Sequence, residues 1–346
     1  KPITLIDSFK ISQSLNNFKS YFQNIGYLEN TAEFKLLKNN LKERYATVDY
    51  IIKTGPQYYI GDVSLDTKSK IIDSIFNNDI EKSFLKKNGV FETLNFQKER
   101  DRINSLMKDN GIYNFQINSI FFDVEIDSTR EVYSLPVNII VEGDDYRKHN
   151  IKEINFINVK NGEEYKEKSF LTNQIEFREN EPFNDSLRSK TIQNLNNLDL
   201  FSFPSIGYEY LSESDSELSA NIFLNPKKKY GLGFGFDIKQ SDIEDIGISF
   251  ENRFKSRNIF KNGENLELSA VGSIGKSNDV TISQVYFDAT LRLPKLIFFG
   301  SLNKRFGSDI KSFISFGSTN QKNIGLDRTS FRFNLNYAWE NKNNFF

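Results

Sequence analysis

From residue 230 onward the chain alternates apolar and polar side chains over strand-length segments, and no other feature restricts its fold as strongly. Between Gln284 and Leu293 the odd-numbered residues are apolar, whereas Gln284, Asp288 and Arg292 lie among the even-numbered ones. A period of two places alternate side chains on opposite faces of a β-strand. The pattern predicts strands near residues 230–238, 246–254, 264–274, 283–293, 311–318 and 329–339.

The apolar faces of these segments favour a membrane β-barrel. A segment of about ten residues is long enough to cross a bilayer when tilted. The opposite faces carry charges, and Tyr337 and Trp339 stand at a strand end, where an aromatic girdle would lie. A soluble antiparallel sheet with one solvent-exposed face would show the same alternation. In a soluble protein, however, another element would have to cover the apolar face, and no helix that could do so follows in the sequence. The residues predicted to face lipid are Ile248, Phe250, Leu266, Leu268, Val285, Phe287, Leu291, Phe331, Phe333 and Leu335.

Residues 1–228 contain a repeated α/β pattern. Three amphipathic helices end in a turn, which falls at Gly26, at Gly111 and at Asp199, where aspartate replaces the glycine. Alternating segments follow the first two helices and turn at Gly55 and Gly143. Each unit reads strand, helical region, helix, strand, strand, with a period of roughly 85–90 residues. The predicted domains are modules at 1–55, 56–144 and 145–228, and then barrel strands at 229–346.

Both ends of this arrangement are predicted to be truncated. The opening strand of the first module is expected before Lys1, because its helix begins near Ser12. A single-chain outer-membrane barrel has at least about eight strands, and an open edge in lipid would leave backbone groups unpaired. Further strands are therefore expected beyond residue 346.

The composition argues against an enzyme. The chain has no Cys and one His, and Lys plus Arg (45) nearly balance Asp plus Glu (46). The absence of Cys excludes disulfides and thiolate metal sites. The balance of charges provides no overall positive potential that would attract nucleic acid. No cofactor is predicted, and His149, among Arg147, Lys148 and Asn150, is predicted to be a solvated turn residue. The sequence contains no run of about 18 apolar residues, so it predicts no transmembrane helix.

Two charged clusters allow more than one interpretation. Asp242, Glu244 and Asp245 fit a polar hairpin tip better than a cation site. The basic run 227–229 fits either a solvated linker or a segment that attracts anionic lipid head groups. The sequence contains no signal peptide, which fits both an exported protein after removal of its targeting segment and a cytoplasmic fragment.

The first predicted barrel strand is rich in glycine. Gly231, Gly233 and Gly235 share one face, and the opposite face is apolar. Glycine weakens a strand, so the strand could open as a gate; equally, the glycines could relieve crowding or permit curvature inside the barrel. The predicted gate residues are Tyr230, Gly231, Leu232, Gly233, Phe234, Gly235 and Phe236.

Modules followed by alternating strands resemble the BamA/TamA superfamily of outer-membrane assembly factors, whose repeated unit is the POTRA module (β-α-α-β-β). The resemblance is carried by Gly26-Tyr27, by 111–113, by the alternating segments 46–65 and 135–159, and by FNDSLRSKTIQNLNNLDLFSFPSIGYEY and SRNIFKNGENLELSAVGSIG. Residues 1–27 look most like the TamA-like TamL branch of Bacteroidetes. The fold class expected is therefore α+β POTRA modules followed by the N-terminal part of an antiparallel transmembrane barrel.

The resemblance implies assembly or insertion of outer-membrane proteins, or translocation, with the modules in the periplasm. Clients would add to POTRA edge strands at about 31–37, 117–123 and 205–211, and the barrel would open between its first and last strands. The implied partners are outer-membrane lipids, unfolded outer-membrane or secreted clients, and an accessory subunit. The alternatives are a passive pore or receptor and a soluble β-rich adhesin. The main client-binding edge predicted is Ser205, Ile206, Gly207, Tyr208, Glu209, Tyr210 and Leu211.

Overall fold

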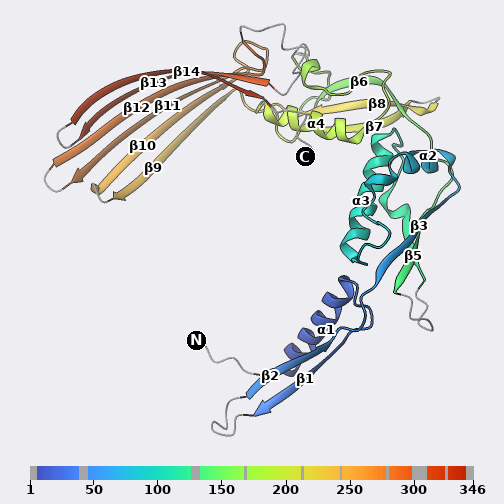
Figure 1. Cartoon of the computed structure of the whole chain (residues 1–346). Helices are drawn as coiled ribbons and strands as arrows, with labels where there is room; N and C mark the ends of the chain where they lie inside the picture. Colours follow the sequence, from blue (N-terminus) through green and yellow to red (C-terminus); the bar gives the residue numbers. More distant parts are fainter. Residues whose placement is uncertain are drawn as a thin grey trace. The chain divides into compact units, whose positions relative to one another are not determined.

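The computed structural model describes residues 6–38, 46–125, 133–166, 170–211, 214–241, 244–277, 280–297, 310–323 and 326–339. The chain forms two compact units: residues 1–149 with 182–184, and residues 150–181 with 185–346. Two α/β modules lie in the first unit, and a third module and a six-stranded sheet lie in the second (Figure 1). The fold is therefore mixed α/β, followed by an antiparallel sheet.

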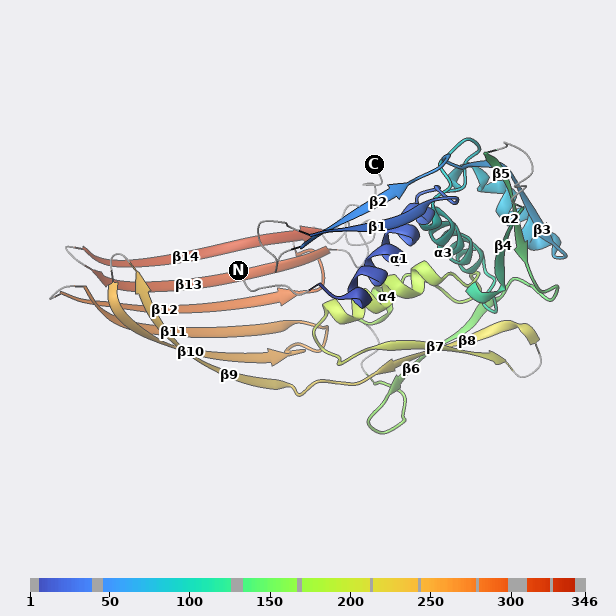
Figure 2. The same ribbon diagram turned by 90° about the horizontal axis from the view of Figure 1, so that it is seen from below.

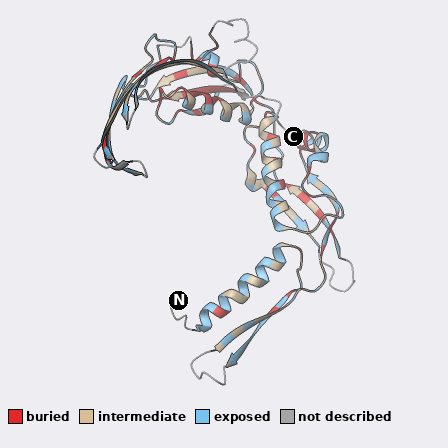
Figure 3. Cartoon of the chain, turned by 60° about the vertical axis from the view of Figure 1, so that its left-hand side comes forward, coloured by how far each residue is buried: buried red, intermediate tan, exposed pale blue. Residues whose placement is uncertain are grey.

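The first module is a helix packed on a two-stranded antiparallel sheet. The helix begins after Asp7, whose carboxylate accepts a hydrogen bond from the Phe9 N–H at 2.9 Å. Phe18 of the helix packs against Tyr50, with ring centroids 5.3 Å apart. A single residue of the helix is buried, so most of its surface is exposed or half-buried (Figure 3). The elements are α1 (Ser8–Asn24), β1 (Thr31–Lys38) and β2 (Ala46–Lys53).

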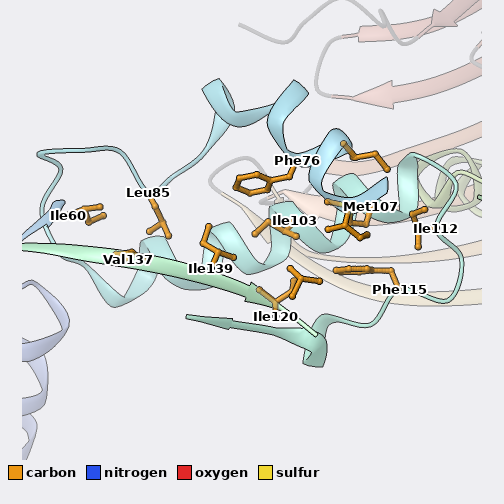
Figure 4. Close-up of a cluster of buried hydrophobic side chains, with 13 residues drawn as sticks. Ile60, Phe76, Leu85, Ile103, Met107, Ile112, Phe115, Ile120, Val137 and Ile139 are labelled. Atoms are coloured by element: carbon orange, nitrogen blue, oxygen red, sulfur yellow. The ribbon is translucent and has the colours of Figure 1, made fainter. Parts of the chain in front are cut away.

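The second module has a three-stranded sheet in the order β3-β5-β4, with β3 parallel and β4 antiparallel to β5. Val137, Ile139 and Val141 alternate along β5, and all three enter the core between the sheet and the helices (Figure 4). The elements are β3 (Tyr59–Thr67), α2 (Lys70–Asn78), η1 (Ile80–Lys82), α3 (Thr93–Asp109), η2 (Ile117–Ser119), β4 (Ile120–Val124) and β5 (Ser134–Val141).

Glu99 of α3 is completely buried, and an ion-pair network inside the second module compensates its charge. Arg102 donates to the two Glu99 carboxylate oxygens at 2.7 and 3.0 Å and contacts the Asp79 carboxylate at 2.9 Å. The Phe84 N–H also donates to Glu99, at 2.9 Å. A carboxylate removed from water must be paired and hydrogen-bonded. The sequence does not reveal this network, because an i,i+3 acid–base pair is equally typical of an exposed helix face.

The third module departs from the expected β-α-α-β-β order. Among its described residues α4 is the only α-helix, and a 3₁₀ turn stands where the first helix was expected. Side chains of α4 bind the backbone of this segment: Asn194 Nδ2 donates to the Gln174 carbonyl at 3.1 Å, and the Glu176 N–H donates to the Thr191 hydroxyl at 3.0 Å. These tertiary hydrogen bonds satisfy backbone groups that a helix would satisfy internally.

The sheet of the third module runs β6-β8-β7, with β6 parallel and β7 antiparallel to β8. One face of β8 is buried, because Leu218, Ala220, Ile222 and Leu224, which alternate along the strand, are all 0% exposed. The elements are β6 (Asn150–Asn158), η3 (Thr172–Gln174), α4 (Asp185–Asn197), β7 (Ser205–Leu211) and β8 (Ser214–Leu224).

The six-stranded sheet is antiparallel throughout, and its strands lie side by side from β9 to β14 (Figure 2). They are 12 to 14 residues long. Each predicted segment therefore corresponds to one strand, and the strands are somewhat longer than the segments. The strands are β9 (Tyr230–Ser241), β10 (Glu244–Arg257), β11 (Asn265–Ser277), β12 (Val280–Leu293), β13 (Ile310–Asn323) and β14 (Leu326–Trp339).

Among the residues that the structure describes, no helix combines the length and apolarity needed to cross a membrane.

Candidate functional site

Each three-stranded sheet ends in a short strand that, within the described chain, pairs with one other strand. β4 pairs with β5, and β7 pairs with β8. The predicted edge 205–211 coincides with β7. The predicted edge at 31–37 lies within β1, which pairs with β2. An edge strand presents a row of backbone donors and acceptors to any segment that can pair with it.

The predicted edge at 117–123 is corrected at its start. Its first three residues form the 3₁₀ turn η2, and β4 begins only at Ile120. The Ser119 hydroxyl donates to the Gln116 carbonyl at 2.6 Å, and the Ser119 N–H donates to the same carbonyl at 3.1 Å. This local bonding favours a turn over a strand.

The opposite edge of each sheet is covered by coil from its own module. The backbone of Ile60 in β3 bonds to the Asn88 N–H and to the Gly89 carbonyl, both at 2.8 Å. In β6, the Ile151 carbonyl accepts from the Asn180 N–H at 2.6 Å, and its N–H donates to the Glu181 carbonyl. β4 and β7 are the opposite edges of these two sheets.

The register of the six-stranded sheet places most of the apolar side chains of its strands on one face, whereas Val271, Ile282 and Phe313 lie on the other. Phe250 pairs with Phe236 of β9, and Phe287 pairs with Ala270 of β11. Residues directly opposite each other point to the same face. All ten residues that the sequence predicted to face lipid lie on this face, and many are well exposed, including Phe331 at 71%. An apolar surface of this extent marks a binding or membrane-contacting face.

The other face of the sheet is polar. Asp288 accepts hydrogen bonds there from the Thr290 hydroxyl at 2.7 Å and the Tyr286 hydroxyl at 3.0 Å. Arg253 pairs with Glu251 on its own strand at 2.6 Å. Charged and hydroxyl side chains thus satisfy one another on this side of the strands.

The three glycines of β9 lie on the polar face, opposite Lys255, Arg253 and Glu251 of β10. A Cβ built on Gly235 would stand 3.4 Å from the Glu251 Cβ, and one on Gly233 would stand 3.7 Å from the Arg253 Cβ. Those are ordinary van der Waals contacts, so a small side chain would fit at either position. Relief of crowding and weak pairing of β9 therefore both stay predictions.

A cluster of opposite charges joins the end of α4 to the start of the six-stranded sheet. The Asp199 carboxylate contacts Lys227 Nζ at 2.6 Å, Lys255 Nζ at 2.8 Å and Arg257 Nε at 3.7 Å. We call these four residues the Asp199 cluster. Lys227 lies in the segment between β8 and β9, and Lys255 and Arg257 lie at the end of β10.

The surroundings of Asp199 lower its pKa. Partial burial opposes ionisation, but the hydrogen bonds and charges of Lys227 and Lys255 outweigh it and lower the pKa of Asp199 to about 2. The carboxylate is therefore ionised throughout the physiological range.

The single histidine was predicted wrongly. His149 is 1% exposed, not solvated. Its backbone N–H donates to the Gly111 carbonyl at 2.9 Å, and the Tyr113 N–H donates to its Nδ1 at 3.3 Å. The Phe183 N–H donates to the His149 carbonyl at 2.8 Å. The polar neighbours in sequence suggested a surface turn, but these backbone bonds hold the ring inside the protein.

The remaining charged candidates have simpler explanations. Of the basic run, Lys227 belongs to the Asp199 cluster, and Lys229 Nζ lies 5.5 Å above the Tyr230 ring. Asp242 lies outside the described residues. Within the described ranges, no group of three or more His, Cys, Asp or Glu side chains is placed to hold a metal ion.

No protein-family model matches this sequence, and no curated protein matches it. Among solved structures, the chain is similar to POTRA domains 3–5 of Haemophilus influenzae BamA, at 14% identity and a TM-score of 0.37, over 64% of this chain and 83% of that one. It is also similar to Haemophilus ducreyi BamA lacking POTRA domains 1–3, at 11% identity and a TM-score of 0.43, over 83% of this chain and 60% of that one. A third similar structure is CdiB from Acinetobacter baumannii, at 11% identity and a TM-score of 0.33, over 96% of this chain and 68% of that one. Similarity this low transfers no function.

The depressed pKa of Asp199 predicts a pH-dependent contribution to stability. A carboxyl whose folded pKa is lowered stabilises the fold above its ordinary pKa of 3.8, and that contribution is lost as the pH falls through about 2. Asp199→Asn should therefore lower the free energy of unfolding by up to about 2 kcal/mol at neutral pH. Urea unfolding of both proteins between neutral and acidic pH measures the difference. A difference that stays the same at every pH contradicts this assignment.

Proposed function

We propose that this chain is part of an outer-membrane protein assembly or translocation factor of the BamA/TamA superfamily. Its α/β modules lie in the periplasm, and its six-stranded sheet forms part of the wall of a transmembrane β-barrel. The observation that carries the proposal is the sheet with one mainly apolar face and one mainly polar, charged face. A barrel wall needs an apolar side toward lipid and a polar side toward its lumen. The chain acts by binding and not as an enzyme.

Clients are received as extended segments. β7 is the open edge of the third module, and a client strand can add to it through main-chain hydrogen bonds with little demand on sequence. An assembly factor must accept many different clients, so backbone recognition suits it. A passive pore has no need of such an edge, which favours assembly or translocation over that alternative.

The client then passes to the barrel at β9. This strand is the first of the six-stranded sheet and lies at its edge within the described residues. In an intact barrel β9 would close against the last strand, and opening of that seam would give the client access to lipid. The partners are outer-membrane lipids, unfolded outer-membrane or secreted proteins, and an accessory subunit.

The barrel proposal predicts opposite outcomes at neighbouring positions of β12. Phe287 lies on the apolar face, so Phe287→Arg should destabilise the inserted barrel by roughly 2–4 kcal/mol if it lies near mid-membrane. Thr290→Arg serves as the matched control, because Thr290 lies on the polar face beside Asp288. Heat-modifiable gel mobility of the full-length protein measures the folded barrel. Equal tolerance at both positions contradicts a lipid-facing apolar side.

The edge proposal predicts client contacts along β7. Photo-crosslinkers at exposed positions such as Ser205 and Glu209 should capture unfolded outer-membrane proteins in cells. A crosslinker at Glu153 of β6 is the control, since coil of the same module covers that edge. Tyr208→Pro or Tyr210→Pro, which removes a backbone donor, should weaken capture if that N–H faces outward. Equal capture at β6 and β7, or none at β7 in a folded protein, would count decisively against strand addition.

The gate proposal predicts that locking β9 stops client insertion. The chain has no Cys, so two engineered cysteines between β9 and the final strand of the intact barrel form a defined disulfide. Insertion should cease in the locked protein and return on reduction. A second disulfide between Phe234 and Asn252, which are paired neighbours in β9 and β10, should leave insertion intact. Normal insertion with the seam locked shows that this seam does not open.

A further inference from the structure

Helix α4 is followed by a left-handed residue that carries a charged side chain. Asp199 has a φ of 57°, whereas Gly26 and Gly111 take this conformation after the helices of the other two modules, with φ of 90° and 96°. A left-handed backbone is least costly for glycine. An aspartate at this position therefore suggests that its side chain contributes something that glycine lacks.

The carboxylate connects three separate segments. It lies on the turn that follows α4, yet its partners come from the segment that links the module to the sheet and from β10. All four side chains of the Asp199 cluster are about one-third exposed or less. Partial burial of this kind makes ion pairs stronger and less screened than exposed surface pairs.

Side chains of the sheet also bind the backbone at the end of α4. Arg257 Nε donates to the Asp199 carbonyl at 3.0 Å, and Asn265 Nδ2 donates to the Leu198 carbonyl at 2.7 Å. The carbonyls at a helix end need partners from outside the helix. Asn265 belongs to β11 and is 5% exposed. The start of the six-stranded sheet therefore supplies the C-terminal cap of α4.

Removal of Asp199 would not leave Lys255 without an ionic partner. Glu267 of β11 lies 3.5 Å from Lys255 Nζ. The loss of the Asp199 carboxylate thus removes the ionic part of the link between the module and the sheet, whereas the bonds of Arg257 and Asn265 to backbone carbonyls remain and Lys255 keeps Glu267 as a partner.

We propose that Asp199 is a positioning residue that latches the third module onto the ends of β10 and β11. It thereby holds β7 in a fixed orientation relative to β9. This inference rests on the proposed function, in which a client moves from β7 to β9. The latch itself, however, is a property of the second unit that can be measured without any client.

Double electron–electron resonance tests the latch in the full-length protein. Asn173→Cys in the module and Thr281→Cys at the far end of β12 give two labelling sites in a chain that has no other Cys. We expect a single narrow distance distribution, and loss of that single peak in Asp199→Gly. Glycine retains the left-handed backbone, so the helix end keeps its conformation. Asp199→Glu should restore much of the peak, because it returns the carboxylate.

Asp185→Ala is the matched control, since it removes an acidic side chain of α4 that pairs with Arg188 of the same helix. This variant should keep the native distribution, and amide exchange of α4 should be unchanged in Asp199→Gly. A native distribution in Asp199→Gly overturns the latch, whatever the protein does with clients. A broadened distribution with normal client insertion supports the latch and overturns its role in the proposed transfer.

Discussion

The register of the six-stranded sheet is the constraint on which the rest of this structure depends. Because side chains alternate along a strand, a slip of one residue would move every apolar side chain of that strand to the charged face. Phe250 opposite Phe236, and Phe316 opposite Phe333, show the same register at both ends of the sheet. The charged side chains are thereby gathered on one face, where they pair with one another and, at the end of β10, with the last module.

The edge strands of the modules, like the strands of the six-stranded sheet, depend on strand pairing. The second and third modules each bond coil to one edge of their three-stranded sheet and have β4 or β7 at the other edge. Backbone donors at such an edge need partners, which makes the edge a natural receiver of an extended segment. Under the proposed function, the protein uses one physical principle twice, since both the module edge and the barrel seam add strands through main-chain hydrogen bonds. The Asp199 cluster then determines how the two edges face each other.

Much of the fold could be predicted because it depends on local periodicity. The strands from residue 230 onward, the faces they present and the buried face of β8 all follow from a period of two. The lack of a first α-helix among the described residues of the third module could not be predicted, because Asn194 and Thr191 bind that segment across 20 and 15 residues of sequence. His149 was misplaced for a similar reason, since its polar neighbours do not reveal the backbone of residues 111–113 that encloses it.

The sequence by itself determined which residues alternate, where helices stop and that this sequence carries one His and no Cys, because these depend on the order and number of residue types. Only the tertiary structure decided which charges meet. Asp199 looks in the sequence like a substitute for a helix-ending glycine. Lys227 belongs to a basic run that fits either a solvated linker or a segment that attracts lipid head groups, and Lys255 is one polar residue of an alternating strand. Their hydrogen bonds join positions 28 and 56 residues apart. Contacts over such separations depend on how strands and helices are brought together, which no local pattern records.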